Sequence, residues 1–327
     1  MLVLASSAVA DDLIYLRQPN SDSVMSIPAT IEDFTGRYIT YRTPAGSKQA
    51  LSSSVESIKH QFSKTFERAR SRFDAGDFPA AEQEWKQDLA DEPKHWVQRE
   101  IRSWLIRAAW RQEHWADAGN QFLSIVAEDP ETYHWPIAPL LWTPFAVREA
   151  DRSVARQWLR DERPAARLLG ASLLVKDVDS ALARSAAQTL ESLKRDSSKQ
   201  VAGLAKAQLW RNRFESAISD NELASWRSDI NYLPAELRSG PQYLLAAAYR
   251  RRGEYDRAAA EFLWVPFIYA QHEPTAARAS LEAGESLLHA ARRVESLKIL
   301  RETAENYPWS RAAQDAKARI TQAETEP

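Results

Sequence analysis

Short β-type runs fill the N-terminal part of the chain, and helical spacing follows them. Three runs rich in Ile, Leu, Tyr, Thr and Val lie at residues 13–16, 24–31 and 37–42. Turn-forming residues separate them, so we expect three or four short strands in a small β module over residues 11–53. From residue 54 onward, segments rich in Ala, Leu, Arg and Glu are broken only by single Gly or Pro residues. This pattern predicts helices to the end of the chain.

A helix-pair pattern is clear in residues 69–93. Gly76 ends a first helix, because glycine adopts a left-handed cap without steric cost. Phe78 marks the turn into a second helix. Ala81 is small enough for two helices to cross closely, and Trp85 lies one turn later on the same face. The pattern predicts two antiparallel helices that share a core.

Two further segments repeat this pattern. The first, residues 105–130, places Trp115, Ala118 and Phe122 at the turn, small and large positions, with Glu113 where the glycine stood. The second, residues 243–262, places Gly253, Tyr255, Ala258 and Phe262 at the same positions. A weaker unit spans residues 276–320, where Val294 and Leu297 match the pattern only loosely.

These residues make the chain similar to tetratricopeptide repeat (TPR) proteins, and its N-terminal β module and ending at Asn306-Tyr307-Pro308 resemble exported bacterial members. The resemblance implies a mainly α solenoid of stacked helix pairs. In the middle third, Ala166, Leu169, Gly170 and Leu174 recur 35 residues later as Val201, Leu204, Ala205 and Leu209. This period is equally typical of HEAT repeats. About 34 residues per unit predicts seven or eight helix pairs.

The expected organisation has six parts. They are a signal-peptide remnant (1–10), the β module (11–53), TPR-like repeats (54–133), a Pro-rich connector (134–150), degenerate helical repeats (151–230) and TPR-like repeats (231–327). The first part is a short apolar run that ends in Ala8-Val9-Ala10, as a cleavage site does. No Lys or Arg precedes the run, and a buried N-terminal strand is the alternative. The run predicts a periplasmic or secreted protein.

Composition argues against several classes of function. Forty-three basic residues nearly balance 45 acidic ones, so the net charge of −2 gives no field that would attract nucleic acid. There is no cysteine, and the pairs His95-Trp96, His114-Trp115 and His134-Trp135 lack the local spacing of zinc ligands. Five Glu-Ser pairs occur, but none is followed by the motif of lytic transglycosylases. We expect no catalytic residues, metal or cofactor, and no membrane span.

The TPR resemblance places ligands in a groove lined by the first helix of each pair. Positions of this chain that match the groove are Arg68, Arg72, Arg102, Gln242, Tyr249 and Arg252. Arginine binds carboxylates bidentately, so this set predicts an acidic or C-terminal peptide of a partner protein. The expected function is therefore a non-enzymatic protein-interaction scaffold or adaptor of the cell envelope. The sequence does not define its oligomeric state.

An alternative function uses aromatic side chains. The chain has twelve tryptophans. Trp85, Trp110 and Trp115 match core positions, whereas Trp135, Trp142, Trp264 and Trp309 lie outside the repeat template. If these four are exposed, they suit a peptidoglycan- or polysaccharide-binding envelope protein. Residues 262–270 form the most apolar helical segment, and we expect either a helix end or a partner-binding patch there.

Overall fold

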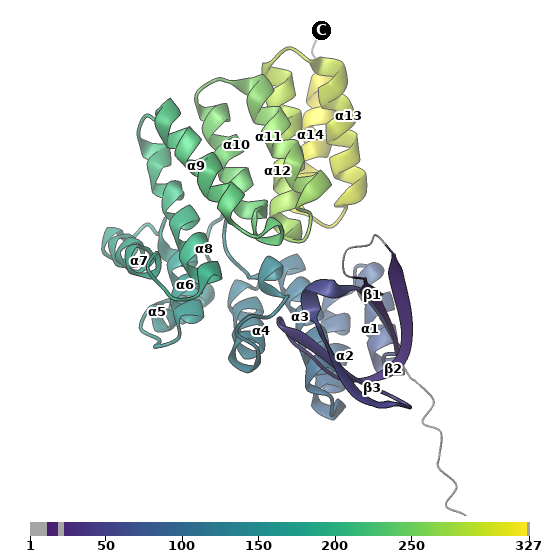
Figure 1. Cartoon of the computed structure of the whole chain (residues 1–327). Helices are drawn as coiled ribbons and strands as arrows, with labels where there is room; N and C mark the ends of the chain where they lie inside the picture. The colour runs from purple at the N-terminus through teal and green to yellow at the C-terminus, as the bar shows by residue number, and fades with distance from the viewer. Residues whose placement is uncertain (1–11, 19–22, 326–327) are drawn as a thin grey trace, which may run out of the picture. The chain divides into compact units, whose positions relative to one another are not determined.

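The computed structural model describes residues 12–18 and 23–325, which form five β-strands followed by fourteen α-helices (Figure 1). The predicted fold class, stacked helix pairs preceded by a small β module, is confirmed. The predicted signal-peptide remnant lies outside the described residues. Contacts divide the chain into a first unit, residues 1–112 and 120–134, and a second unit, residues 113–119 and 135–327. Among the described helices, none is both long and apolar enough to cross a membrane.

The strands form one antiparallel sheet in the order β4-β3-β2-β1-β5. Their bounds are β1 Asp12–Arg17, β2 Val24–Phe34, β3 Tyr38–Thr43, β4 Gly46–Leu51 and β5 Val55–His60. The long strand β2 pairs with β1 through its first half and with β3 through its second half. The sheet has five strands where three or four were expected, because residues 55–60, predicted to be helical, form β5 on the edge beside β1.

The sheet shares a hydrophobic core with the first three helices, α1 Lys64–Asp74, α2 Phe78–Asp91 and α3 His95–Arg111. Ile14 and Ile39 of the sheet are fully buried, and they belong to the same cluster as Phe66 of α1 and Trp96 of α3. The β module is therefore part of the first unit's core and is not a separate domain.

The remaining helices follow in pairs joined by short turns. Their bounds are α4 Trp115–Glu128, α5 Glu149–Trp158, α6 Pro164–Leu174, α7 Ser180–Leu193, α8 Lys199–Leu209, α9 Asp220–Tyr232, α10 Ser239–Arg251, α11 Tyr255–Ile268, α12 Glu273–His289, α13 Arg293–Asn306 and α14 Arg311–Thr325. Each helix from α10 to α14 packs on the next, and α12 also contacts α10 and α14, so that α14 lies between α12 and α13 in Figure 1. The number of helices agrees with the seven or eight pairs expected.

The turn between paired helices recurs with the same backbone geometry. Gly76, Gly253 and Ala291 have φ values of 85°, 77° and 59°. The N–H of the residue after each donates to the carbonyl five residues earlier, as Asp77 does to Arg72 at 2.9 Å. Glu113, which replaces the glycine of the second repeat, adopts the same region with a φ of 57°. The turn is thus kept where the sequence lacks glycine.

The predicted repeat core is largely buried. Phe78, Ala81, Trp85, Trp115, Ala118, Phe122, Ala258 and Phe262 are all less than 9% exposed. Tyr255 is half-buried and stacks on His289 at 4.9 Å. In the last repeat, the predicted match of Val294 to the turn position was wrong, because Val294 is 80% exposed. Ser296 and Leu300, both fully buried, occupy the small and large positions instead.

The Pro-rich connector is irregular, as predicted, apart from a short turn of helix at Trp135–Ile137. It is nevertheless buried. Trp135 and Trp142 are each 4% exposed, so these two of the four candidate tryptophans are not available to a contact surface. Trp264 and Trp309 are 49% and 48% exposed. The apolar segment 262–270 ends α11 and exposes Phe267 and Ile268 beside Trp264.

Candidate functional site

Two of the arginines predicted to bind a partner are bonded to their own repeat. Arg68 and Arg72 of α1 each donate from Nε to a different oxygen of Glu84 on α2, both at 2.7 Å. Burial raises the pKa of Glu84, but the hydrogen bonds from Arg72 and Arg68 outweigh it and lower that pKa. These two arginines therefore tie α1 to α2.

Two further predicted residues make equivalent bonds. Arg102 of α3 donates to Gln121 of α4 at 2.8 Å, and Gln242 of α10 donates to Glu261 of α11 at 2.6 Å. Like Glu84, the acceptors Gln121 and Glu261 directly precede the large buried aromatic of the second helix. The structure thus shows a repeating polar contact between the two helices of a pair.

Tyr249 and Arg252 also have partners within the chain. Tyr249 is 4% exposed, and the guanidinium of Arg257 lies 4.5 Å above its ring. Arg252 pairs with Asp220 at 2.6 Å and with Glu254 at 2.8 Å. Each of the six predicted residues is therefore engaged in an intramolecular contact. Their assignment to partner binding stays a prediction.

The first helices of the first unit carry a different set of arginines around an indole. Arg70 of α1 lies 4.0 Å from the Trp104 ring centroid, and Arg107 of α3 lies 4.9 Å from it. Arg111 lies 5.5 Å from the ring of Phe73, which packs edge-on to Trp104. We call these five residues, Arg70, Phe73, Trp104, Arg107 and Arg111, the basic aromatic face.

The salt bridge that Arg70 makes at this face is weak. Arg70 contacts Asp74 at 3.3 Å, but both side chains are more than 40% exposed, and such pairs contribute about 0–1 kcal/mol. Arg107 donates at 3.0 Å to the carbonyl and hydroxyl of Ser103. Guanidinium groups stacked on an indole keep their N–H edges directed outward for carboxylates. The face can therefore bind carboxylate groups and an apolar side chain together.

The corresponding helices of the second unit differ. Glu282 and Glu285 of α12, with side chains 6% and 11% exposed, lie among three arginines of α10, α12 and α14. Arg278 donates to Glu282 at 2.7 Å, while Arg250 and Arg319 reach Glu285 at 3.0 and 2.9 Å. Here each arginine has a carboxylate beside it, so this network stabilises the stacking of three helices.

The sequence also carries a signal for the basic aromatic face. Arg70 and Arg107 are 37 residues apart, the same offset that relates Phe78 to Trp115. Equal offsets place the two arginines at the same position of successive repeats. The predicted residues Arg68 and Arg72 point toward α2, whereas Arg70 points toward α3.

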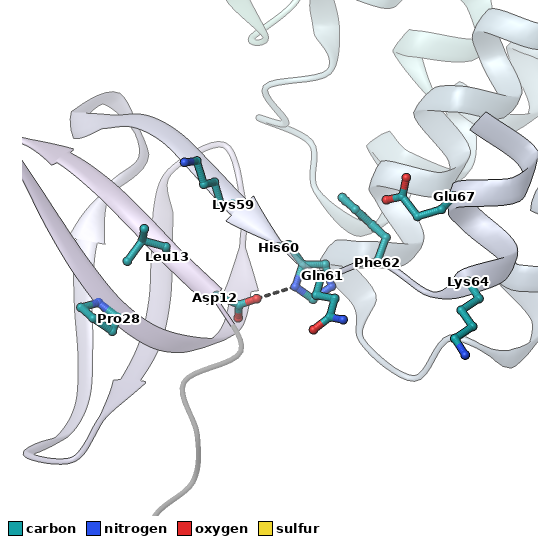
Figure 2. Close-up of a pocket in the computed structure, with 9 residues that line it drawn as sticks. All are labelled: Asp12, Leu13, Pro28, Lys59, His60, Gln61, Phe62, Lys64 and Glu67. Carbon is teal, nitrogen blue, oxygen red and sulfur yellow. Dashed lines mark hydrogen bonds and ion pairs between the residues drawn. The ribbon is translucent and has the colours of Figure 1, made fainter. Parts of the chain in front are cut away.

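A separate pocket of about 710 Å³ lies where the sheet meets the start of α1. Figure 2 shows its floor, where the Asp12 carboxylate is hydrogen-bonded to the His60 imidazole. The second Asp12 oxygen accepts from the Ile31 N–H at 2.6 Å. The His60 ring lies edge-on to Phe62 and to Trp96, with centroids 4.8 and 4.7 Å away. Within residues 12–18 and 23–325, no group of three or more His, Cys, Asp or Glu could hold a metal ion.

The Asp12 contact makes stability depend on pH. Burial raises the pKa of Asp12, but the bonds from His60 and the Ile31 N–H outweigh it, so the pKa lies below its ordinary 3.8. A depressed carboxyl pKa stabilises the fold above the ordinary value, and this stability is lost as the pH falls through the folded value. We expect Asp12→Asn to lower the urea-unfolding free energy at neutral pH and to flatten its decline in acid. Exposed Asp91→Asn is the control, and an unchanged acid profile for Asp12→Asn would contradict the assignment.

Comparison with known proteins gives only distant likenesses. The chain matches no protein-family model and no curated protein. It is similar to the solved structure of a tetratricopeptide repeat protein from Parabacteroides merdae, at 16% identity and a TM-score of 0.41, over 80% of this chain and 98% of that one. It is also similar to a signal transduction ATPase with numerous domains and a tetratricopeptide repeat sensor from Pyrococcus horikoshii, at 16% identity and a TM-score of 0.39. That match covers 80% of this chain and 38% of the other.

Proposed function

We propose that this protein is a non-enzymatic interaction scaffold that binds an acidic segment of a partner protein through the basic aromatic face. The observation that carries the proposal is the indole of Trp104 between the guanidinium groups of Arg70 and Arg107. These arginines come from neighbouring first helices, α1 and α3, so one extended segment can reach both.

The chemistry of the face favours carboxylates. Arginine presents a planar fork of N–H donors that matches a carboxylate, and such charge-assisted bonds are about twice as strong as neutral ones. The half-buried indole of Trp104 adds an aromatic surface that suits an apolar side chain of the same segment. The cell-envelope setting is part of this proposal and rests on residues 2–10 of the sequence alone. Subcellular fractionation of the tagged protein tests it.

Replacing Arg70 and Arg107 together with Gln is expected to weaken binding of a fluorescein-labelled peptide of alternating Asp and Leu by about 10-fold or more. The reason is the loss of two guanidinium forks from one surface. Fluorescence anisotropy measures the affinity, and a peptide with Asn in place of Asp reports the contribution of charge. Thermal unfolding should change little, because Arg70 is half-exposed and both substitutions keep polar side chains.

Arg68→Gln/Arg72→Gln is the matched control, because it removes the same charge from the same part of the first unit. We expect it to leave peptide affinity nearly unchanged and to lower stability slightly through loss of the Glu84 contacts. The opposite pattern would support the residues predicted from the sequence and exclude the basic aromatic face. Equal losses in both variants would indicate attraction by charge alone.

A further inference from the structure

The second unit contains a groove of about 520 Å³ that belongs to none of the sites above. Side chains of α7, α8, α9 and the short helix η3 (Trp210–Glu215) line it. All of these elements lie within the second unit. A volume of this size falls in the range of ligand-binding pockets.

The groove has a rigid apolar floor. Trp210 and Trp226 stack with parallel rings, at a centroid distance of 4.7 Å and an interplanar angle of 5°. Both indoles are 5% exposed, so packing holds them in place. Leu209 and Ala187 are half-buried and line the groove beside them. These side chains are already held in place, so an apolar side chain that enters the groove need not first order them.

The rim of the groove has more cations than carboxylates. The lining includes Arg184, Lys194, Lys206 and Arg213 but only Glu191 and Glu222. Lys194 pairs with Glu191 at 2.6 Å, Arg213 with Glu222 at 2.8 Å, and Lys206 with Asp229 at 2.6 Å.

Arg184 differs from the other three cations. It is exposed, and no hydrogen bond or ion pair joins it to another residue of the described chain. A guanidinium on the wall of an apolar groove is complementary to a carboxylate on the molecule that fills the groove.

We propose that this groove binds a short peptide segment of a partner protein that carries one apolar side chain and a neighbouring carboxylate. The apolar side chain packs on Leu209 and the stacked tryptophans, and the carboxylate pairs with Arg184. The site shares no residue with the basic aromatic face, so it is a second and independent peptide site. A scaffold with both sites would contact its partner through each unit.

Two variants of the full-length protein test the groove, with the labelled Asp-Leu peptide as probe and anisotropy as readout. Ala187→Glu fills the groove and adds a negative charge, and we expect it to weaken binding by about 10-fold or more. Arg184→Gln removes the unpaired guanidinium, and we expect a loss of about 3- to 5-fold for the Asp peptide and none for its Asn counterpart. Arg195→Gln is the control, because Arg195 is exposed just beyond α7 and does not line the groove.

All measurements are made in the Arg70→Gln/Arg107→Gln background, which removes the first proposed site. Binding that persists in this background and falls with Arg184→Gln and Ala187→Glu supports the groove. Equal affinities for the Arg184→Gln and Arg195→Gln variants, or no binding in this background, would overturn it. If Ala187→Glu alters the circular dichroism spectrum, the decision rests on Arg184→Gln. The basic aromatic face is tested in the same way in the Arg184→Gln background, with and without Arg70→Gln/Arg107→Gln, because both sites bind the same labelled peptide. A loss in that background supports the face whatever the result for the groove.

Discussion

Replacing Trp85 with alanine is expected to lower the free energy of unfolding of the first unit by about 3 to 5 kcal/mol. Trp85 is fully buried, with Phe66, Phe73 and Trp104 at centroid distances of 6.1, 5.7 and 5.5 Å. Its indole N–H has no hydrogen-bond partner in the described structure, so the loss comes from packing and apolar burial alone. Urea denaturation followed by circular dichroism measures it.

The control for this prediction is Trp264→Ala, which removes the same side chain from a half-exposed position at the end of α11. We expect that loss to be below about 1 kcal/mol. A loss of that size for Trp85→Ala would mean that the first repeat is loosely packed. Because Trp85 stacks on Trp104, the variant should also weaken peptide binding at the basic aromatic face.

The repeats could be predicted because their chemistry is local and regular. Glycine at a left-handed turn, alanine at a helix crossing and an aromatic one turn later each have a strong physical preference for their position. Gly76 and Gly253 therefore identify two turns by themselves. Ala291 does not, because alanine has no preference for the positive φ that it adopts there.

Strand β5 could not be predicted for a related reason. It lies at the edge of the sheet and has a half-exposed, mostly polar pattern, so it lacks the apolar alternation of a core strand. Its partner β1 is about 40 residues earlier in the chain. Residues 55–60 form a strand because they pair with β1, and the local pattern of apolar and polar residues does not predict this pairing.

The burial of the Pro-rich connector could not be predicted from its sequence. Irregular backbone is usually at the surface, because its polar groups need water. Here two buried side chains replace water: Ser172 accepts the Leu141 N–H at 2.8 Å, and Gln208 donates to the Leu141 carbonyl at 3.0 Å. The connector is thereby packed within the second unit, and Trp142 is buried with it.

The sequence predicted that arginines on the first helices bind a partner, and this stays a prediction. The sequence could not show that Glu84 lies within reach of Arg68 and Arg72, since that contact depends on the crossing of α1 and α2. The side of a helix that faces a neighbour can be inferred from spacing, but the partner of each charge cannot.

Replacing Gly170 with alanine is expected to destabilise the second unit by about 2 kcal/mol or more. In an isolated helix this change would stabilise by about 0.5 to 1 kcal/mol, because glycine is the more flexible residue. In α6, however, the new Cβ would lie 2.6 Å from the Ala155 carbonyl oxygen and 2.9 Å from the Leu159 nitrogen. Both atoms are backbone, so α5 must move away as a whole, and overpacking of this kind typically costs about 1 to 3 kcal/mol.

Gly203→Ala in α8 is the matched control for this substitution. Its Cβ would lie 2.4 Å from a terminal methyl of Leu233, which is the end of a flexible side chain and can rotate away. We therefore expect a change in unfolding free energy near zero, with the helix preference for alanine offsetting the contact. Thermal and urea unfolding measure the stability of the two variants. The difference between them compares the cost of a backbone clash with that of a side-chain clash in neighbouring helices. Equal stability of the Gly170→Ala and Gly203→Ala variants would contradict the backbone contact between α5 and α6. That contact is also our explanation for glycine at position 170, where the repeat counterpart is Ala205.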